Sequence, residues 1–160
     1  MDKIIFTPIG IIHTPFNKPE GTPIQPTAAR NIEGTIEIYQ EYHKGLLDLD
    51  GFSHIILLYQ FHLMKVFSLK VKPYLDIIQH GVFATRAPAR PNPIGMSIVN
   101  LVKIEKEILF IKGVDIIDGP PLLDIKPYIK EFDSYPEAKC GWYDNREINS
   151  TLSDNRFSKQ

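Results

Sequence analysis

The chain has 160 residues, of which 43% are hydrophobic and 23% are charged, and its formal net charge at pH 7 is −1. These values predict one globular domain with a substantial core. The charge excludes a generally basic surface for nucleic acids but leaves room for a local basic patch. No apolar run is long enough for a membrane span, residues 1–16 lack the features of a signal peptide, and the single cysteine, Cys140, excludes an intrachain disulfide. We therefore predict a cytoplasmic protein that does not associate with membranes.

Short apolar runs rich in Ile, Val and Phe, interrupted by Pro, Gly or Asp-Gly, favour strands over long helices. In chain order, the predicted strands are Ile4–Thr14, Gly34–Tyr39, His54–His62, Gly81–Thr85, Ser97–Lys106, Ile108–Ile116 and Leu122–Ile125. A hairpin with its turn near residues 105–107 joins two of these strands. Two short helices are predicted at Gly45–Leu49 and Lys72–His80, the second with Pro73 in its first turn and Gly81 at its end. Many strands and few helices predict a mainly β fold, either a barrel or a sandwich.

From Glu131 onward the chain is polar, and this change of composition predicts a tail rather than a further domain. Trp142 is the expected anchor of the tail, because a large aromatic side chain gains much from burial. The last dozen residues are expected to be mobile.

The stretch GVFATRAPARPNPIG, residues 81–95, is unusually stiff and cationic. Each proline fixes its own φ and holds the preceding residue in an extended conformation, so the loop loses little entropy when it meets a ligand. Arg86 and Arg90 can each present a planar fork to a carboxylate or phosphate, or stack on a base. A rigid connector whose arginines face water explains the composition equally well.

Asp115 and Asp118 lie three residues apart and are followed by Gly-Pro-Pro. They face one cleft only if the chain bends at Asp118-Gly119, which this sequence favours. There they would accept hydrogen bonds from a ribose hydroxyl or an ammonium group. The alternative is that Asp118 caps a turn and that Asp115 pairs with a nearby cation.

Several polar side chains stand at the predicted ends of strands or in loops. Phe61-His62 follows the most apolar run, where the histidine either contacts a ligand or is a hydrogen-bonded rim residue. Gln25, in the loop TPIQPT, could read a purine edge or an amino acid, or simply face solvent. Lys126 and Tyr128 offer a cation and an aromatic ring suited to nucleic acid, although a salt bridge and a core tyrosine are as compatible.

Motifs of other enzyme classes are absent from the sequence. It has no GxGxxG, no GxxxxGK[ST] and no GxSxG, and its five histidines show no metal-ligand spacing. We therefore expect no Rossmann-type nucleotide site and no metal.

Five segments together carry a resemblance to a known family: IGIIHTPF at Ile9–Phe16, TPIQP at Thr22–Pro26, GLLDLDGFSHIILLYQFH at Gly45–His62, GVFATRAPARPNPIGMS at Gly81–Ser97 and VDIIDGPPLLDIKPY at Val114–Tyr128. In order and spacing the chain resembles the TsaA-like (TrmO-type) single-sheet β-barrel family. Its characterised members are S-adenosylmethionine-dependent tRNA methyltransferases that methylate N6 of N6-threonylcarbamoyladenosine next to the anticodon. The chain looks like a short, barrel-only form, since longer bacterial members carry an additional C-terminal domain.

The resemblance implies a single-sheet antiparallel β-barrel with a few short helices over residues 1–132, followed by a polar tail over 133–160. It also implies a homodimer that binds tRNA and uses S-adenosyl-L-methionine as cofactor. The cofactor contacts that it implies are Gln25, Pro26, Thr27, Phe61, His62, Arg86, Met96, Asp115, Ile116, Ile117 and Asp118.

The resemblance leaves the catalytic base open, and we expect Asp118, His62 or water to accept the N6 proton. Substrate contacts are expected from Arg86, Arg90, Asn92, Lys126 and Tyr128. Arg86 would bind either the cofactor carboxylate or the threonyl carboxylate of the modified nucleoside. Two other functions remain open at this point: a cofactor- or RNA-binding module without transferase activity, and methyl transfer to a small metabolite.

Overall fold

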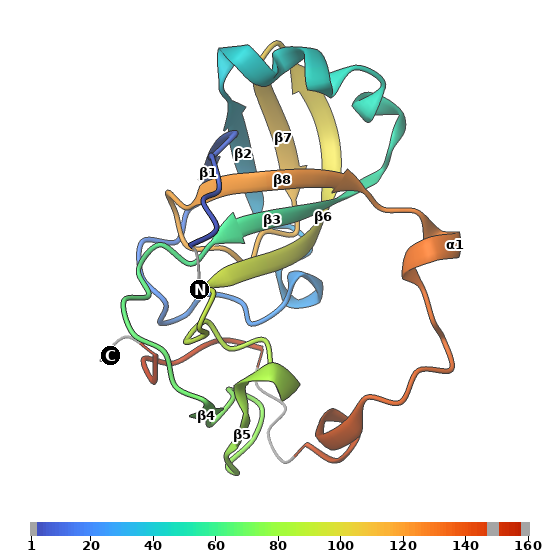
Figure 1. Ribbon diagram of the computed structural model, residues 1–160. Coiled ribbons are helices and arrows are strands. Elements are labelled where there is room, and N and C mark those ends of the chain that lie inside the picture. The colour runs from blue at the N-terminus through green and yellow to red at the C-terminus, as the bar shows by residue number, and fades with distance from the viewer. Residues whose placement is uncertain (1–2, 147–150, 158–160) are drawn as a thin grey trace.

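A computed structural model describes residues 3–146 and 151–157, apart from the side chains of residues 26 and 27. Six antiparallel strands form a closed barrel in the order β1-β2-β7-β6-β3-β8 (Figure 1). Their bounds are β1 Gly10–His13, β2 Glu33–Ile38, β3 His54–Gln60, β6 Ile94–Glu105, β7 Ile108–Lys112 and β8 Pro121–Pro127. The predicted single-sheet antiparallel barrel is confirmed.

Alternation along the strands builds the barrel core. In β3 the side chains of Ile55, Leu57 and Tyr59 are buried while their neighbours are more exposed, as the period of two in a strand requires. Strand β6 does the same with Ser97, Val99 and Leu101. The inward positions carry β-branched or otherwise apolar residues almost throughout. Their side chains therefore fill the interior of the barrel and form its core.

Tyr59 and Gly95 form a tight contact at one end of the barrel. The two residues are partners in the β3–β6 register, and the Tyr59 ring is buried. A Cβ added at Gly95 would lie 2.4 Å from two atoms of that ring, far inside van der Waals contact. Gly95 is therefore required for the Tyr59 ring to occupy this position.

Below this end of the barrel in Figure 1, residues 61–93 and 151–157 form a second, smaller unit, which we name the cap. It contains the two-stranded sheet of β4 (Lys70–Val71) and β5 (His80–Gly81), followed by the 3-10 turn η4 (Val82–Ala84). Its own buried cluster consists of Val71, Val82, Ala87, Ala89 and Phe157.

The chain end contributes directly to the cap. Backbone hydrogen bonds join the Gly21 nitrogen to the Ser153 oxygen and the Ile24 nitrogen to the Thr151 oxygen, each at 3.0 Å. Phe157 is 4% exposed and packs near Tyr74, with a centroid separation of 5.2 Å. The expectation of a mobile last dozen residues is therefore wrong for residues 151–157, because an aromatic side chain and a backbone pairing hold them.

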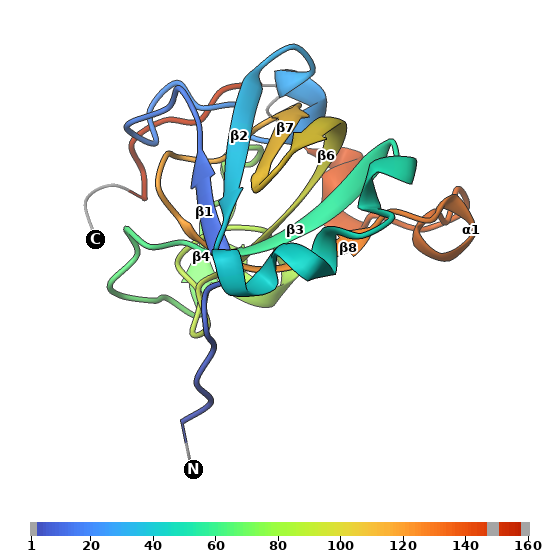
Figure 2. The same cartoon turned by 90° about the horizontal axis from the view of Figure 1, so that it is seen from above.

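After β8 the chain runs away from the barrel before it reaches the cap again, and we name residues 128–146 the excursion (Figures 1 and 2). It contains α1 (Lys130–Asp133) and η5 (Gly141–Asn145). Trp142 returns to the cap, where its Nε1 donates to the Ala84 oxygen at 2.7 Å and its ring stacks on His80 at 4.6 Å. The predicted anchoring by Trp142 is confirmed, whereas the domain division at residue 132 stays a prediction.

The predicted helix at Lys72–His80 is wrong, and the structure shows why. The Asp76 carboxylate accepts hydrogen bonds from the backbone nitrogens of Ile77 and Ile78 and lies 3.0 Å from His80 Nε2. These bonds satisfy the backbone locally in a turn, which competes with helix formation.

The other differences lie at the bounds of elements. Predicted strand Gly81–Thr85 contains only one residue of β5 before η4 begins, so that prediction is also wrong. The predicted strand from Ile4 starts only at Gly10, after Pro8, which has no N–H to donate. Strand β3 ends before Phe61, and β7 ends at Lys112, before Gly113 with its φ of 83°. Instead of one helix at Gly45–Leu49, 3-10 segments occupy Gln40–Leu46 (η2) and Leu49–Gly51 (η3), separated by Asp48 at a φ of 65°.

Replacing Gly95 by alanine tests the contact with Tyr59. We expect Gly95→Ala to lower the free energy of unfolding by about 1–3 kcal/mol, because overpacking displaces a buried ring. Urea denaturation followed by circular dichroism measures this change. Gly45→Ala is the control, since a Cβ there would meet no atom within 4 Å. Equal stability of the two variants would contradict the packing argument.

Candidate functional site

A cavity of about 400 Å³ lies between the open end of the barrel and the cap. This volume suits a small organic ligand. Of the residues singled out in the sequence, it brings together Gln25, Phe61, His62, Arg86, Arg90, Met96, Asp115, Ile116 and Ile117. Five separate segments of the chain thus converge on one space.

Asp115 is the buried anion of this cavity. The Ser97 hydroxyl donates to Asp115 Oδ1 at 2.6 Å, and the Tyr59 hydroxyl lies 3.2 Å from Ser97 Oγ. Because Ser97 has one hydroxyl proton and gives it to Asp115, Tyr59 donates to Ser97. The chain of two hydroxyls therefore points its positive ends at the carboxylate.

Burial sets the protonation of this network. It raises the pKa of Asp115 to about 6, while the hydrogen bond from Ser97 and the positive charge of Arg86 act in the opposite direction. Burial and the charge of Asp115 together raise the pKa of the Tyr59 hydroxyl far above its ordinary value. At neutral pH the cavity therefore carries a negative charge at Asp115 and a neutral phenol behind it.

The proline loop directs its two arginines to different tasks. Arg90 Nη1 lies 3.2, 2.8 and 3.4 Å from the carbonyl oxygens of Val82, Thr85 and Ala87, and thus closes the loop on itself. Arg86 is exposed, and its Nη1 donates to Gln25 Oε1 at 3.1 Å. Arg86 therefore presents its charge to the cavity, whereas Arg90, which also lines it, holds the backbone in shape.

His62 lies on the cavity wall close to the Asp118-Gly119 turn. A Cβ at Gly119 would lie 4.0 Å from His62 Nε2. Burial lowers the pKa of His62, and the charge of Asp118 opposes this shift only in part. The imidazole is therefore neutral at pH 7, with a lone pair that can accept a proton.

Asp118 itself does not line the cavity. Its Oδ1 accepts a hydrogen bond from the Thr14 nitrogen at 2.8 Å and lies 3.8 Å from His13 Nδ1, while its own nitrogen donates to the Phe16 oxygen. These contacts fix the segment that follows β1. The geometry thus gives Asp118 a turn-forming role, and proton acceptance by Asp118 stays a prediction.

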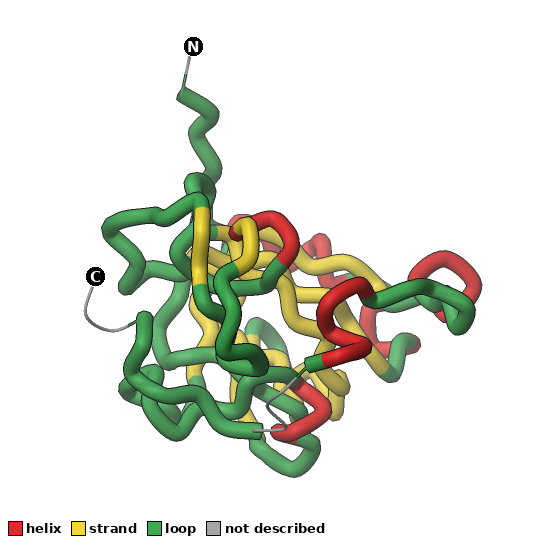
Figure 3. Tube along the Cα trace, turned by 90° about the horizontal axis from the view of Figure 1, so that it is seen from below, coloured by secondary structure: helices red, strands yellow, loops and turns green. Residues whose placement is uncertain are grey.

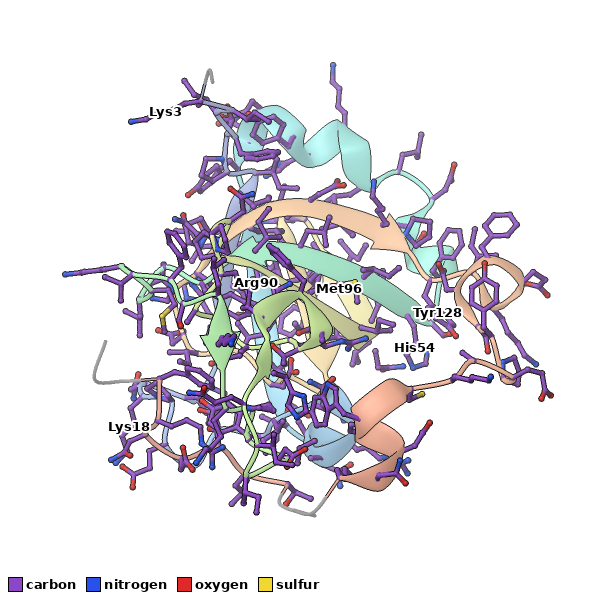
Figure 4. The ribbon with its side chains drawn as sticks, turned by 60° about the horizontal axis from the view of Figure 1, so that its bottom comes forward. Lys3, Lys18, His54, Arg90, Met96 and Tyr128 are labelled. Carbon is purple, nitrogen blue, oxygen red and sulfur yellow. The ribbon has the colours of Figure 1, made fainter. Side chains whose placement is uncertain are left out.

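The remaining sequence-predicted residues lie elsewhere. Asn92 is exposed outside the cavity, and Lys126 pairs with Asp124 at 2.8 Å. Tyr128 packs edge-on against His54 at 6.3 Å, at a distance from Arg90 and Met96 (Figure 4). The backbone of residues 26 and 27 opens the 3-10 turn η1 (Pro26–Ala29), but the side chains of Pro26 and Thr27 lie outside the described part of the chain.

Sequence reasoning missed several residues of the cavity. Ser97 and Tyr59 complete the Asp115 network, and Tyr74, Thr85 and Phe157 close the cap side. A polar Ser97 at an inward position of an apolar strand was a usable signal, because buried hydroxyls require partners. Nothing in the polar tail pointed to Phe157.

Two properties of the described residues bear on the class of site. No group of three or more His, Cys, Asp or Glu side chains among them is arranged to hold a metal ion. Within the same part of the chain, no helix has both the length and the apolar character needed to cross a membrane.

The chain belongs to the family described as tRNA-methyltransferase O N-terminal domain, whose model matches residues 11–134. A probable S-adenosyl-L-methionine-binding protein from Pyrococcus abyssi is 53% identical over 156 residues, which are 96% of this chain and 85% of that protein. Human tRNA (adenine(37)-N6)-methyltransferase is 34% identical over 163 residues, covering 94% of this chain and 37% of the enzyme. The crystal structure of TrmO from Pseudomonas aeruginosa superposes with a TM-score of 0.74 at 36% identity, over 88% of this chain and 62% of that one. This chain thus spans less than two thirds of both TrmO and the human enzyme.

The raised pKa of Asp115 predicts a pH-dependent effect of its replacement. In the folded protein Asp115 ionises only near pH 6, so between pH 4 and 7 its charge costs stability relative to the unfolded chain. A pKa raised from 3.8 to about 6 corresponds to about 3 kcal/mol. Relative to the wild type, Asp115→Asn should therefore gain about 3 kcal/mol in the free energy of unfolding from pH 4 to pH 7.

Urea denaturation at four pH values between 4 and 7 measures this difference, and Asp50→Asn at an exposed site serves as the control. If the stability difference between Asp115→Asn and the wild type stays constant with pH, the carboxylate does not have a raised pKa.

Proposed function

We propose that the protein transfers a methyl group from S-adenosyl-L-methionine to N6 of N6-threonylcarbamoyladenosine next to the anticodon of tRNA. Membership of the tRNA-methyltransferase O family supports methyl transfer to tRNA, as do relatives named as cofactor-binding proteins and tRNA adenine-N6 methyltransferases. The observation that carries the proposal is one small cavity lined by both the anion of Asp115 and the cation of Arg86, a pair of charges that suits a zwitterionic ligand.

The residues of the cavity fit this cofactor. When bound, S-adenosyl-L-methionine supplies an electrophilic methyl group on a positively charged sulfur. Asp115 can hold its ammonium group or attract the sulfonium, and Arg86 can bind its carboxylate. Phe61 can pack on the adenine, and Gln25, held by Arg86, can hydrogen-bond to a base edge or an amino acid group.

The acceptor nitrogen of threonylcarbamoyladenosine carries one proton, which must leave as the new carbon–nitrogen bond forms. His62 is the best-placed acceptor, because its neutral Nε2 lies on the cavity wall. The negative charge of Asp118 acts on His62 and would stabilise the imidazolium after proton transfer. Most of the remaining rate enhancement comes from holding the two reactants in line.

The proposal also includes a homodimer in the cytoplasm, the compartment in which the protein would meet tRNA. The homodimer is supported by a set of apolar side chains that are exposed at the periphery of the single chain. They are Ile4, Ile5 and Phe6 on the N-terminal segment that runs away from the barrel in Figure 2, and Phe132 and Tyr135 on the excursion. Sedimentation equilibrium tests this part of the proposal directly.

Methyl transfer to modified tRNA is the central test. Purified protein with labelled S-adenosyl-L-methionine should methylate tRNA that carries threonylcarbamoyladenosine. The same tRNA without the modification should remain unlabelled. Mass spectrometry of the digested nucleosides gives product and substrate together. Cofactor binding without transfer to either tRNA would contradict the proposed activity and favour a binding module.

Two substitutions should separate cofactor binding from the chemical step. Arg86→Ala should raise the dissociation constant of the cofactor at least tenfold, because hydrogen bonds to charged groups contribute about 1.5–3 kcal/mol. His62→Ala, measured with saturating cofactor, should slow single-turnover transfer by about 100-fold or more whatever its effect on this constant. Calorimetry and rapid-quench kinetics provide the two readouts. Lys65→Ala, which removes an exposed charge of the cap outside the cavity, is the control. Unimpaired transfer by His62→Ala would remove His62 from the mechanism.

A further inference from the structure

A second, larger cavity of about 1100 Å³ runs beside the first. It is a groove, bounded by the flank of the barrel on one side and by the cap loop 83–87 and residues 140–143 of the excursion on the other. Seen from below, this end of the molecule consists mainly of loops (Figure 3). Its volume exceeds what a single small ligand fills, so its shape fits a segment of polymer better.

All fully charged side chains among the described residues that line the groove are positive: Arg30, Arg86 and Lys112. His54 adds a group that can become positive, and no Asp or Glu is among the lining residues described. Of these three, Lys112 forms an ion pair with Glu33, which lies outside the groove, at 3.2 Å between Nζ and Oε1. On a chain with a net charge of −1, this concentration of positive charge is a local basic patch.

Aromatic rings line the same groove. Phe83 is 75% exposed and Tyr143 is 40% exposed. The Trp142 ring is held by its bond to Ala84 and by stacking on His80, so it offers a fixed platform. Tyr128, packed against His54, lines the barrel side. Exposed rings interleaved with cations are the combination that binds unstacked bases and their phosphates.

The groove is continuous with the smaller cavity. The two share Ile24, Gln25, Tyr74, Thr85, Arg86 and Phe157. The hydrogen bond between Arg86 and Gln25 therefore lies at the junction. A polymer in the groove can extend one unit into the smaller cavity while its neighbours remain on the aromatic rings.

We propose that this groove binds single-stranded RNA that flanks the nucleotide that enters the smaller cavity. Arg30 and Lys112 contact phosphates, and bases stack on Trp142 and Tyr143. The proposal rests on the proposed function for the nature of the entering nucleotide, but the charges and rings of the groove stand independently of it. A duplex would not serve, since its stacked bases cannot reach the rings.

Trp142 is the only tryptophan of the chain, so its fluorescence reports on the groove. The experiment titrates the full chain with a seven-nucleotide single-stranded RNA and follows both tryptophan fluorescence and the anisotropy of an end-labelled RNA. We expect binding with strong quenching. Inorganic polyphosphate and polyglutamate, which carry charge without bases, should not quench.

Variants locate the binding site. Arg30→Ala should weaken RNA binding and reduce the slope of log K against log salt by about 0.7, the value for one phosphate contact on a single strand. Tyr143→Leu should weaken binding about tenfold or more, since one stacked base contributes about 1–3 kcal/mol. Lys44→Ala, on η2 at the far end of the barrel in Figure 1, should bind as the wild type does. Circular dichroism shows whether each variant is folded.

Three outcomes would overturn the inference: RNA binding without quenching, equal effects of Arg30→Ala and Lys44→Ala, or burial of Trp142 by a second copy at rising protein concentration. Its failure can be told apart from failure of the proposed function. If methyl transfer is insensitive to Arg30→Ala and Tyr143→Leu, the groove does not bind the RNA, whereas the proposed function is unaffected. Quenching by RNA without any methyl transfer would support the groove as an RNA-binding site and contradict the proposed function.

Discussion

The guanidinium of Arg90 is the interaction on which the rest of the site depends. Three carbonyl oxygens of the loop, from Val82, Thr85 and Ala87, converge on one of its nitrogens. Inside a folded protein such carbonyls need donors, and prolines nearby cannot supply them. All three contacts are made by the same nitrogen, Nη1, so a single side chain ties these three carbonyl groups of the loop together. With the loop closed in this way, Ala87 and Ala89 reach the small core of the cap and Arg86 points outward. The stiffness of the loop and its charge are thus separate properties, carried by separate residues.

The barrel side of the cavity contributes a negative charge, Asp115, and other residues of the barrel hold that carboxylate in place. Asp115 follows β7, where the strand has ended and its carboxylate faces the cavity. A carboxylate in this position loses water, which is why its pKa is raised. Ser97 and Tyr59 replace part of the lost solvation, and Gly95 leaves room for the Tyr59 ring that completes the network. The residual cost becomes useful when a cation enters the cavity, because an incompletely solvated anion attracts it more strongly than a surface carboxylate does.

The pattern of short apolar runs predicted a mainly β fold, because the period of two along strands such as β3 and β6 is a local property. The choice of a barrel over a sandwich came from the family resemblance. The sequence predicted the convergence of Gln25, Phe61, Arg86 and Asp115 through family resemblance, since no short-range pattern brings these positions together. It failed where a side chain competes with the backbone, because the Asp76 carboxylate replaces the predicted helix by a turn. For Asp118 the sequence left two roles open, and the bond to the Thr14 nitrogen agrees with the turn-forming one. The role of residues 151–157 could not be predicted either, because the residues that bury Phe157 lie far from it in the sequence.

The two cavities meet at Arg86, and this has a consequence for how the site discriminates among ligands. A cation bound near Asp115 would leave Arg86 available to the groove, whereas a carboxylate in the small cavity would compete with the groove for the same guanidinium. Gln25 can follow either position, because its amide both donates and accepts. The charge that Arg86 offers to the groove would therefore depend on what fills the small cavity. Occupancy of one cavity changes the electrostatic potential of the other, and coupling of this kind is reciprocal by thermodynamic necessity. If the two cavities hold the cofactor and the RNA as proposed, the arginine that they share at the junction would couple the two binding events.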